Sequence, residues 1–475
     1  MGTQDKKLGL GLLITLGIGS MIGGGIFNSP TDLITKANPQ AALIAWIIGG
    51  FGIICLALVF QFLANKRPDL KGGIYSYAQD GFGDFMGFNS AWGYWLSAWL
   101  GNIAFIILMF KTINSLLGPG NELKPIISFI AATLLLWVVH FIQTKGTKSA
   151  GIINAVVTIG KLLPLALVII LGIFIFKPDL FTVQNWSTVL ASSGESTSLL
   201  KQINGAMGTI IWCFIGVEAS VVLSEKAESQ AIVGKATVIS LLVTLLIYVS
   251  ISLLAMGIIP AKELVASGTP LAEVLSKTVF GGAGGVIVKL GLITSLFGAL
   301  ISWVMLAAEI PYVAAKDGVM PKWFAKENSA NVPINSLTFT NIVSQIFLCS
   351  LLSDKLQSAY GLVFAIATTC MLIPYALSSF YAIKVCNQEN INGKDKVIAI
   401  LSAIYTLYGI YAGGIKYFAL AFIMYAFGII VFHKAKKEKG AEYTSTEKIA
   451  SIIVVAVGVL MVILLATGRY HYSIK

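Results

Sequence analysis

Gly17-Ile18-Gly19-Ser20-Met21-Ile22-Gly23-Gly24-Gly25-Ile26-Phe27 is the stretch that decides the fold of this chain. It lies in an apolar window near residues 10–34 and places five glycines within nine residues. Each glycine costs an α-helix about 0.8–1 kcal/mol relative to alanine. Isolated small residues also serve tight helix packing, but three consecutive glycines favour an unwound backbone. The stretch therefore predicts a membrane-spanning helix that is interrupted near its middle.

The composition predicts an all-α protein that crosses the membrane many times. Hydrophobic residues make up 56% of the 475 residues, charged residues 12%, and the mean hydropathy is +0.84. A water-exposed globular surface, roughly 25–35% charged, cannot be built from this composition. Apolar windows of about 20 residues, enough to span the hydrocarbon, recur thirteen times, near 10–34, 41–64, 84–112, 125–143, 149–176, 203–224, 234–259, 285–314, 335–353, 358–385, 396–413, 415–433 and 449–467. Only Gly413-Gly414 separates two of them, so a long hairpin over 396–433 is the alternative there.

The distribution of cations predicts the orientation. With the N-terminus in the cytoplasm, the inner segments hold 20 of the 33 lysines and arginines, as the positive-inside rule requires. An odd number of spans then places the C-terminus outside. The net charge of +11 is explained by this topology and by lipid head groups, and we expect no nucleic-acid partner. The run after Lys6-Lys7 has no small-x-small cleavage site, so we expect a retained first span.

The interrupted helix predicts a binding site. Unwound backbone at membrane depth is tolerated only where protein covers it or where it lines a wet cavity. One half-helix ends there with free carbonyls and the next begins with free amides. These groups suit the ammonium and the carboxylate of a free amino acid, respectively. Glycines also let a ligand approach the backbone closely.

Polar residues at membrane depth mark further candidates. Lys161 lies in the apolar run 156–176, where a charge costs about 2.5–3.5 kcal/mol on insertion scales. It either snorkels to an interface or turns into the bundle, and we expect the second. Glu218, in the window near 203–224 with its scattered glycines, is paired, protonated or a gate. Asn102 must hydrogen-bond a neighbouring helix or a ligand. Glu309 either meets an inner lysine or reaches water.

Three motifs in order resemble the amino acid–polyamine–organocation superfamily over residues 8–433: Gly23-Gly24-Gly25-Ile26-Phe27, Phe214-Ile215-Gly216-Val217-Glu218 and Ala314-Ala315-Lys316-Asp317-Gly318-Val319-Met320-Pro321. The resemblance implies a ten-helix core over 1–385 with the LeuT-like 5+5 inverted repeat. The repeats would cover 8–176 and 203–385, with helices 1 and 6 discontinuous. Residues 386–475 would form two or three additional C-terminal transmembrane helices.

Two further segments are similar to branches of that superfamily that carry cationic amino acids. Tyr94 to Ala104 resembles the third helix of arginine/agmatine antiporters, and Glu309 to Asn328 resembles the bacterial arginine/ornithine branch. The resemblance implies that Trp212 acts as a gate and Trp303 as a platform for the guanidinium, although Trp303 could also only fill space. The implied substrate-binding residues are Ser20, Met21, Gly23, Gly24, Gly25, Ser97, Ala98, Asn102, Trp212, Ile215, Trp303, Thr368 and Thr369. The implied gating and coupling residues are Lys161, Trp212, Glu218 and Glu309.

Within these implied sets, Ser20, Gly24 and Gly25 would lie at the substrate carboxylate, and the carbonyls of Met21, Trp212 and Ile215 would hold its α-ammonium. The cationic side chain would be surrounded by Ser97, Ala98, Asn102 and Trp303. Lys161 has no counterpart in the arginine/agmatine antiporters. It resembles a fifth-helix lysine of sodium-independent members, whose ammonium would stand where sodium bridges the first and eighth helices in sodium-coupled relatives. Its expected partners are backbone carbonyls near residues 17–19.

The sequence thus predicts a secondary exchanger of cationic amino acids in the cytoplasmic membrane, with arginine/ornithine antiport as the first interpretation. Proton-coupled uptake of lysine or arginine, exchange of an amino acid for its decarboxylated amine, and a sensor without transport stay open. No nucleotide-binding Gly-x-x-x-x-Gly-Lys-[Ser/Thr] motif is present, and the three histidines lie at window ends or a terminus. We therefore expect no enzyme activity, no cofactor and no metal. Small cationic amino acids and the lipid bilayer are the expected partners, and homodimerisation is left open.

Overall fold

The computed structural model describes residues 7–353, 369–412 and 415–470, in which helices are joined by short loops and no β-strand occurs. The α-helices are α1 (Leu10–Met21), α2 (Gly25–Ile34), α3 (Pro39–Lys66), α4 (Ile74–Phe82), α5 (Asp84–Leu117), α6 (Pro125–Thr144), α7 (Thr147–Ile175), α8 (Pro178–Phe181), α9 (Leu199–Cys213), α10 (Ala219–Val222), α11 (Gln230–Met256), α12 (Ala261–Ala266), α13 (Pro270–Ser276), α14 (Gly281–Lys316), α15 (Ile334–Phe347), α17 (Leu372–Gln388), α18 (Lys394–Ala412), α19 (Ile415–Lys439) and α20 (Ser445–Ala466). Three short 3₁₀ helices are η1 (Ser224–Lys226), η2 (Lys322–Ala325) and η3 (Leu348–Leu352).

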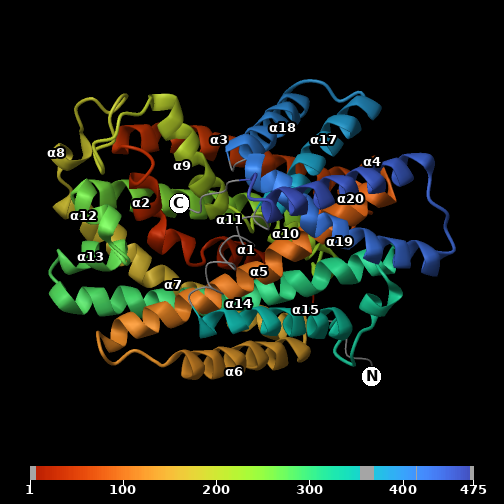
Figure 1. The fold of residues 1–475 in the computed structure, drawn as a ribbon, viewed down its shortest axis with the longest axis horizontal. Helices are drawn as coiled ribbons and strands as arrows, with labels where there is room; N and C mark the ends of the chain where they lie inside the picture. The colour runs from red at the N-terminus through yellow and green to blue at the C-terminus, as the bar shows by residue number, and fades with distance from the viewer. Residues whose placement is uncertain (1–6, 354–368, 413–414, 471–475) are drawn as a thin grey trace.

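The long helices run side by side, with α8, α12 and α13 at one end of the bundle and α4 near the other (Figure 1). The longest, α14 and α5, pack against each other and form the centre: 78% of the most apolar window of α14 is buried inside the protein. In α20 the corresponding share is only 17%, although its hydropathy is the highest. Because such an apolar surface is stable only in hydrocarbon, α20 faces lipid and α14 faces protein.

Ten described helices are long and apolar enough to cross a membrane alone, and the pair α1 and α2 makes an eleventh span if counted together. These correspond to eleven of the thirteen predicted windows. The window near 203–224 is divided into α9 and α10, and the window near 358–385 lies partly outside the described residues. The two windows in 396–433 are separate candidate spans, 394–412 and 417–439. The total of thirteen stays a prediction.

The predicted interruption of the first span is confirmed. α1 ends at Met21, α2 begins at Gly25, and the two pieces are bent by 40°. A Cβ added at Gly23 would lie 2.9 Å from Phe105 Cε1, and one at Gly24 would lie 2.4 Å from Leu108 Cδ2. Both contacts are shorter than real Cβ atoms tolerate, so the glycines let α5 approach the broken segment.

A second break faces the first. α9 ends at Cys213, and five residues of turn separate it from α10. Within the turn, Gly216 has φ 112°, and a Cβ there would lie 2.9 Å from the backbone carbon of Ser20. The Ser20 hydroxyl donates a hydrogen bond of 2.9 Å to the Gly216 carbonyl. The two breaks are therefore joined directly, at a position that only glycine fits.

We expect Gly216→Ala to destabilise the protein, because alanine would be strained at this φ and would press on Ser20. Backbone strain of this kind costs of order 1–3 kcal/mol, measurable as a lower melting temperature of the purified protein in detergent. Gly208→Ala is the matched control, since Gly208 lies inside α9 and its added Cβ would meet nothing nearer than 3.9 Å. Equal melting temperatures of the two variants would contradict the assigned constraint.

Candidate functional site

A narrow cavity, with a volume of about 30 Å³ open to a water-sized molecule, lies where the two breaks face each other. Its walls come from α1, α2, α5, α9, α11 and α14, elements that are distant in the sequence. None of the lining side chains is charged. The lining residues are Ser20, Met21, Gly23, Gly25, Ser97, Gly101, Phe105, Trp212, Ile215, Tyr248 and Trp303.

The start of α2 presents free donors at this cavity. The backbone N–H groups of Gly24 and Gly25 have no acceptor among the described residues. Gly25, the first residue of the helix, lines the cavity. The first N–H groups of a helix carry partial positive charge and bind anions such as a carboxylate. This end of the cavity is therefore suited to a carboxylate.

Backbone acceptors also lie at the cavity. The Ile215 carbonyl, in the turn after α9, accepts no hydrogen bond from the described residues. The Met21 carbonyl accepts from the Tyr248 hydroxyl at 3.2 Å and from the Gly23 N–H at 3.0 Å. A ligand ammonium can thus bind Ile215 directly, whereas at Met21 it would compete with Tyr248.

Aromatic faces complete the cavity. The Trp303 indole N–H donates to the Ser20 carbonyl at 2.9 Å, and its ring stacks on Tyr94 with 6.1 Å between centroids. These contacts fix the orientation of Trp303. Trp212 lies beside the start of α2, because a Cβ at Gly25 would be 3.2 Å from Trp212 Nε1. A desolvated tryptophan face attracts a cation by about 2 kcal/mol, so an uncharged wall can still hold a cationic group.

Lys161 is fully buried and lies behind the first break. Its ammonium donates to the carbonyls of Gly19 at 3.0 Å and Ile22 at 2.5 Å. Ser295 of α14 donates to the Ile22 and Gly23 carbonyls, each at 3.1 Å. The predicted contact with the first-helix backbone is confirmed at Gly19 and extends to Ile22, and snorkelling is excluded. The predicted role of Lys161 in coupling stays a prediction.

The two predicted intramembrane acids differ in their surroundings. Glu218 is fully buried and accepts hydrogen bonds from the Tyr375 hydroxyl and, at 3.0 Å, from the Gly216 N–H. In the part of the chain that the structure describes, its Oε1 has no hydrogen-bond partner and no lysine or arginine forms an ion pair with Glu218, so protonation and a gating role stay predictions. Glu309 is also buried, and its Oε1 likewise has no hydrogen-bond partner among the described residues. It forms no ion pair with a described lysine, so the expected lysine contact is not seen.

Some of the predicted substrate residues lie outside the cavity. Gly24 lines a smaller neighbouring cavity, and Ala98 is buried. Asn102 is buried, and neither its amide oxygen nor its amide nitrogen has a partner among the described residues. Thr369 is buried as well, and Thr368 lies outside the described residues. The structure thus places Ser20, Met21, Gly23, Gly25, Ser97, Trp212, Ile215 and Trp303 around one cavity.

Three lining residues were not predicted from the sequence: Gly101, Phe105 and Tyr248. Ser97, Gly101 and Phe105 follow one another at intervals of four on α5, so they share one helix face. That spacing could have added Gly101 and Phe105 to the predicted Ser97. Tyr248 comes from α11, and no sequence pattern connects it with the glycine-rich break.

The structure defines a multi-span helical membrane protein with a buried cavity between two helix breaks. The chain belongs to the amino acid permease family, whose model matches residues 8–433. It is 41% identical to an arginine/ornithine antiporter of Pseudomonas aeruginosa, over 95% of this chain and 96% of that protein. It is 35% identical to an arginine/ornithine antiporter of Latilactobacillus sakei, over 98% of both chains. A putative arginine/ornithine antiporter of Escherichia coli is 36% identical over 91% of this chain and 93% of its own.

We expect Lys161→Ala to lower amino acid flux by about tenfold or more, because two backbone carbonyls at the break would lose a buried charged donor worth roughly 1.5–3 kcal/mol. The flux of labelled amino acid into proteoliposomes is measured over a series of pH values. Lys177→Ala, an exposed lysine just after α7, is the control and should behave as the unmodified protein. Normal flux of the Lys161 variant at every pH would show that the lysine is only structural.

Proposed function

We propose that the protein exchanges cationic amino acids by secondary active transport, with arginine and ornithine as the pair. The observation that carries the proposal is the cavity with free N–H groups at the start of α2 and a free carbonyl at Ile215. Opposite helix ends of this kind bind the two charges that every free α-amino acid carries. The names of the relatives supply the choice of arginine and ornithine.

In the proposed complex, the substrate carboxylate binds the amides of Gly24 and Gly25, and the α-ammonium binds the Ile215 and Met21 carbonyls. The cationic side chain extends along the face of Trp303 toward Ser97. No acidic side chain lines the cavity. Cation–π attraction of about 2 kcal/mol in a desolvated site would hold a guanidinium or an ammonium without an ion pair, and so would allow rapid release.

The proposed cycle is alternating access around this single site. Residues 8–176 and 203–385 would form two inverted repeats, with 386–475 as additional helices and the N-terminus in the cytoplasm. The facing breaks of α1–α2 and α9–α10 support this arrangement, because inverted repeats place their discontinuous helices opposite each other at the membrane midplane. As a carrier, the protein would act in the cytoplasmic membrane and catalyse no covalent chemistry.

A competition panel tests the substrate assignment. Proteoliposomes loaded with unlabelled ornithine are given labelled arginine, and amino acids and their decarboxylated amines compete from outside. We expect arginine and ornithine to compete best and labelled uptake to require internal substrate. Uptake that instead requires an imposed proton gradient would establish proton coupling, stronger competition by the amines would establish amine exchange, and binding without flux would establish a sensor.

We expect Trp303→Ala to weaken arginine binding by about tenfold or more, because loss of the desolvated indole face removes about 2 kcal/mol of cation–π attraction. The apparent affinity is measured by exchange in proteoliposomes. Trp323→Ala is the control, since the Trp323 side chain is half exposed at 49% and lies outside the cavity. Unchanged affinity of the Trp303 variant would remove this residue from the site.

We expect Asn102→Ala to change the preference among arginine, ornithine and lysine, because the Asn102 amide is buried next to Gly101 of the cavity wall without a partner. An unpaired buried amide costs of order 1–3 kcal/mol, which a substrate side chain could recover. Asn89→Ala is the control on the same helix, since Asn89 donates only to the Phe85 carbonyl of its own helix. The same ranking in both variants would place Asn102 outside the site.

A further inference from the structure

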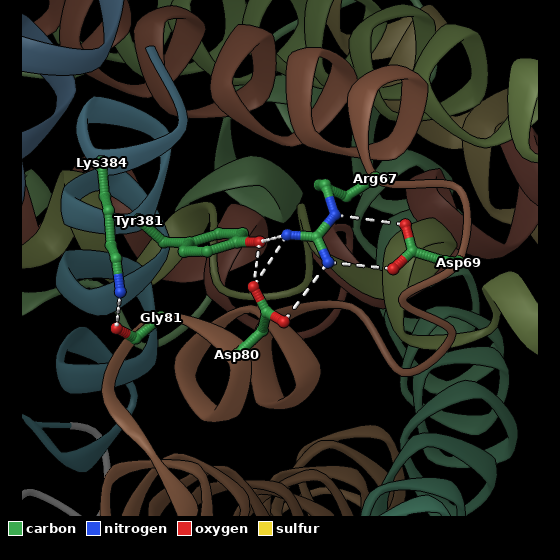
Figure 2. A network of polar contacts seen from close by, with 6 residues as sticks. All are labelled: Arg67, Asp69, Asp80, Gly81, Tyr381 and Lys384. Atoms are coloured by element: carbon green, nitrogen blue, oxygen red, sulfur yellow. Dashed lines mark hydrogen bonds and ion pairs between the residues drawn. The ribbon is translucent and has the colours of Figure 1, made fainter. Parts of the chain in front are cut away.

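Arg67 lies at a junction of three elements at the end of the bundle that we assign to the cytoplasm (Figure 2). It directly follows α3 and donates to Asp69 at 3.2 and 2.9 Å and to Asp80 of α4 at 2.7 and 3.3 Å. One of its terminal nitrogens also donates to the Tyr381 hydroxyl of α17. These five hydrogen bonds use all five N–H donors of a guanidinium. Nothing in this arrangement leaves the side chain free to rotate.

The choice of arginine at position 67 is informative. The chain has 33 basic residues, and only Arg67 and Arg469 are arginines. A lysine ammonium carries three donors at one point and cannot bridge two carboxylates and a hydroxyl in one plane. The hydrogen bonds from Arg67 also hold the pKa values of Asp69 and Asp80 below their usual range, so both carboxylates are ionised at neutral pH. The contacts at position 67 therefore depend on the planar, forked geometry of the guanidinium and not on its charge alone.

Further contacts bind the same part of α17 to α4. The Tyr381 ring stacks on Tyr77 with 6.0 Å between centroids and 14° between planes, and both rings are buried. A Cβ at Gly81 would lie 2.7 Å from Tyr381 Cδ2, so the glycine permits this packing. Lys384, one turn further, donates to the Gly81 carbonyl at 2.6 Å. Arg67 thus completes a rigid attachment of α17 to α3 and α4.

The same helix reaches the binding site. Tyr375 lies six residues before Tyr381 on α17, about 9 Å along the helix axis at 1.5 Å per residue. Its hydroxyl donates to Glu218, which also accepts from the Gly216 N–H. The Gly216 carbonyl in turn accepts from Ser20, a residue of the cavity wall. A displacement of α17 at Tyr381 therefore moves a hydroxyl that helps to hold the second helix break.

We propose that Arg67 is a positioning residue for transport: it fixes α17 through Tyr381 so that Tyr375 stays on Glu218 beside the binding cavity. The proposal rests on the transport function proposed above. Arg67 touches no residue of the cavity wall, so its loss alters the rate of the conformational cycle and leaves substrate affinity unchanged. It acts through Tyr375, and its effect disappears when the Tyr375 hydroxyl is already absent.

Arg67→Lys tests whether the forked guanidinium is required, because lysine keeps the positive charge but lacks the fork. We expect kcat for arginine/ornithine exchange to fall by about tenfold and KM to stay within about twofold, the pattern of a residue that does not contribute uniform substrate binding. Lys66→Ala is the matched control, because Lys66 is the adjacent residue and also joins α3 to the end of α17, through an exposed ion pair with Glu389 at 3.3 Å. Its kinetics should equal those of the unmodified protein.

The double variant distinguishes positioning from general destabilisation. If Arg67 acts through Tyr375, Arg67→Lys combined with Tyr375→Phe should be no slower than Tyr375→Phe alone, since coupled residues are non-additive. Multiplication of the two effects, or normal kcat in Arg67→Lys, would overturn the proposal. If Arg67→Lys does not fold, Tyr381→Phe takes its place in the double-mutant comparison with Tyr375→Phe, because it removes only the hydroxyl that Arg67 contacts.

The proposed function and this inference can fail separately. Absence of arginine/ornithine exchange by the unmodified protein would reject that substrate pair, and the same variants would then be measured with the amino acid that it does carry. Arginine affinity of each purified variant, measured by calorimetry, provides a readout independent of flux. Lowered affinity in Arg67→Lys at full Tm would also overturn the positioning role.

Discussion

Backbone groups that lose their helical partners inside a membrane must find others, and this constraint organises the whole protein. In hydrocarbon, each unsatisfied N–H or C=O group costs several kcal/mol. The break between α1 and α2 frees a set of such groups, and four side chains from three other helices donate hydrogen bonds to the carbonyls. These side chains are Lys161 of α7, Tyr248 of α11, and Ser295 and Trp303 of α14. The backbone donors at the start of α2 stay unpaired, and the binding site proposed above is built on them.

The same constraint decides what could be predicted from the sequence. Three consecutive glycines in an apolar run disfavour a smooth helix, so the first break followed from local chemistry. A lysine in an apolar run requires acceptors, but the choice of first-helix carbonyls as the partners of Lys161 came from the family resemblance. The second break depends on one glycine, Gly216, whose positive φ is set by its contact with Ser20. Such a contact joins residues 196 positions apart, and no local pattern encodes it.

The cavity wall shows the same limit. Ser97 and Trp303 were predicted from the family resemblance. Tyr248 was not predicted, because its hydroxyl reaches the Met21 carbonyl only through the packing of α11 against the end of α1. Asn102 and Gly24 have polar or steric properties that suit a site, yet both lie behind the wall of the cavity in this conformation. The tyrosines that meet Glu218 and Arg67 are likewise ordinary apolar-helix residues in the sequence. Their significance comes from the packing of α17 against residues that lie 157 and 314 positions earlier in the sequence.

The free N–H groups of Gly24 and Gly25 belong to the main chain, so they are present whatever side chains surround them. In the proposed complex, the groups that bind the α-carboxylate are therefore separate from the side chains, such as Ser97 and Trp303, that would distinguish one amino acid from another. Point mutations can change the recognition of the substrate side chain while the backbone groups that bind the α-carboxylate stay the same. In a protein built in this way, a few substitutions on α5 and α14 would change which amino acid is transported. Binding of the α-amino and α-carboxylate groups would be retained.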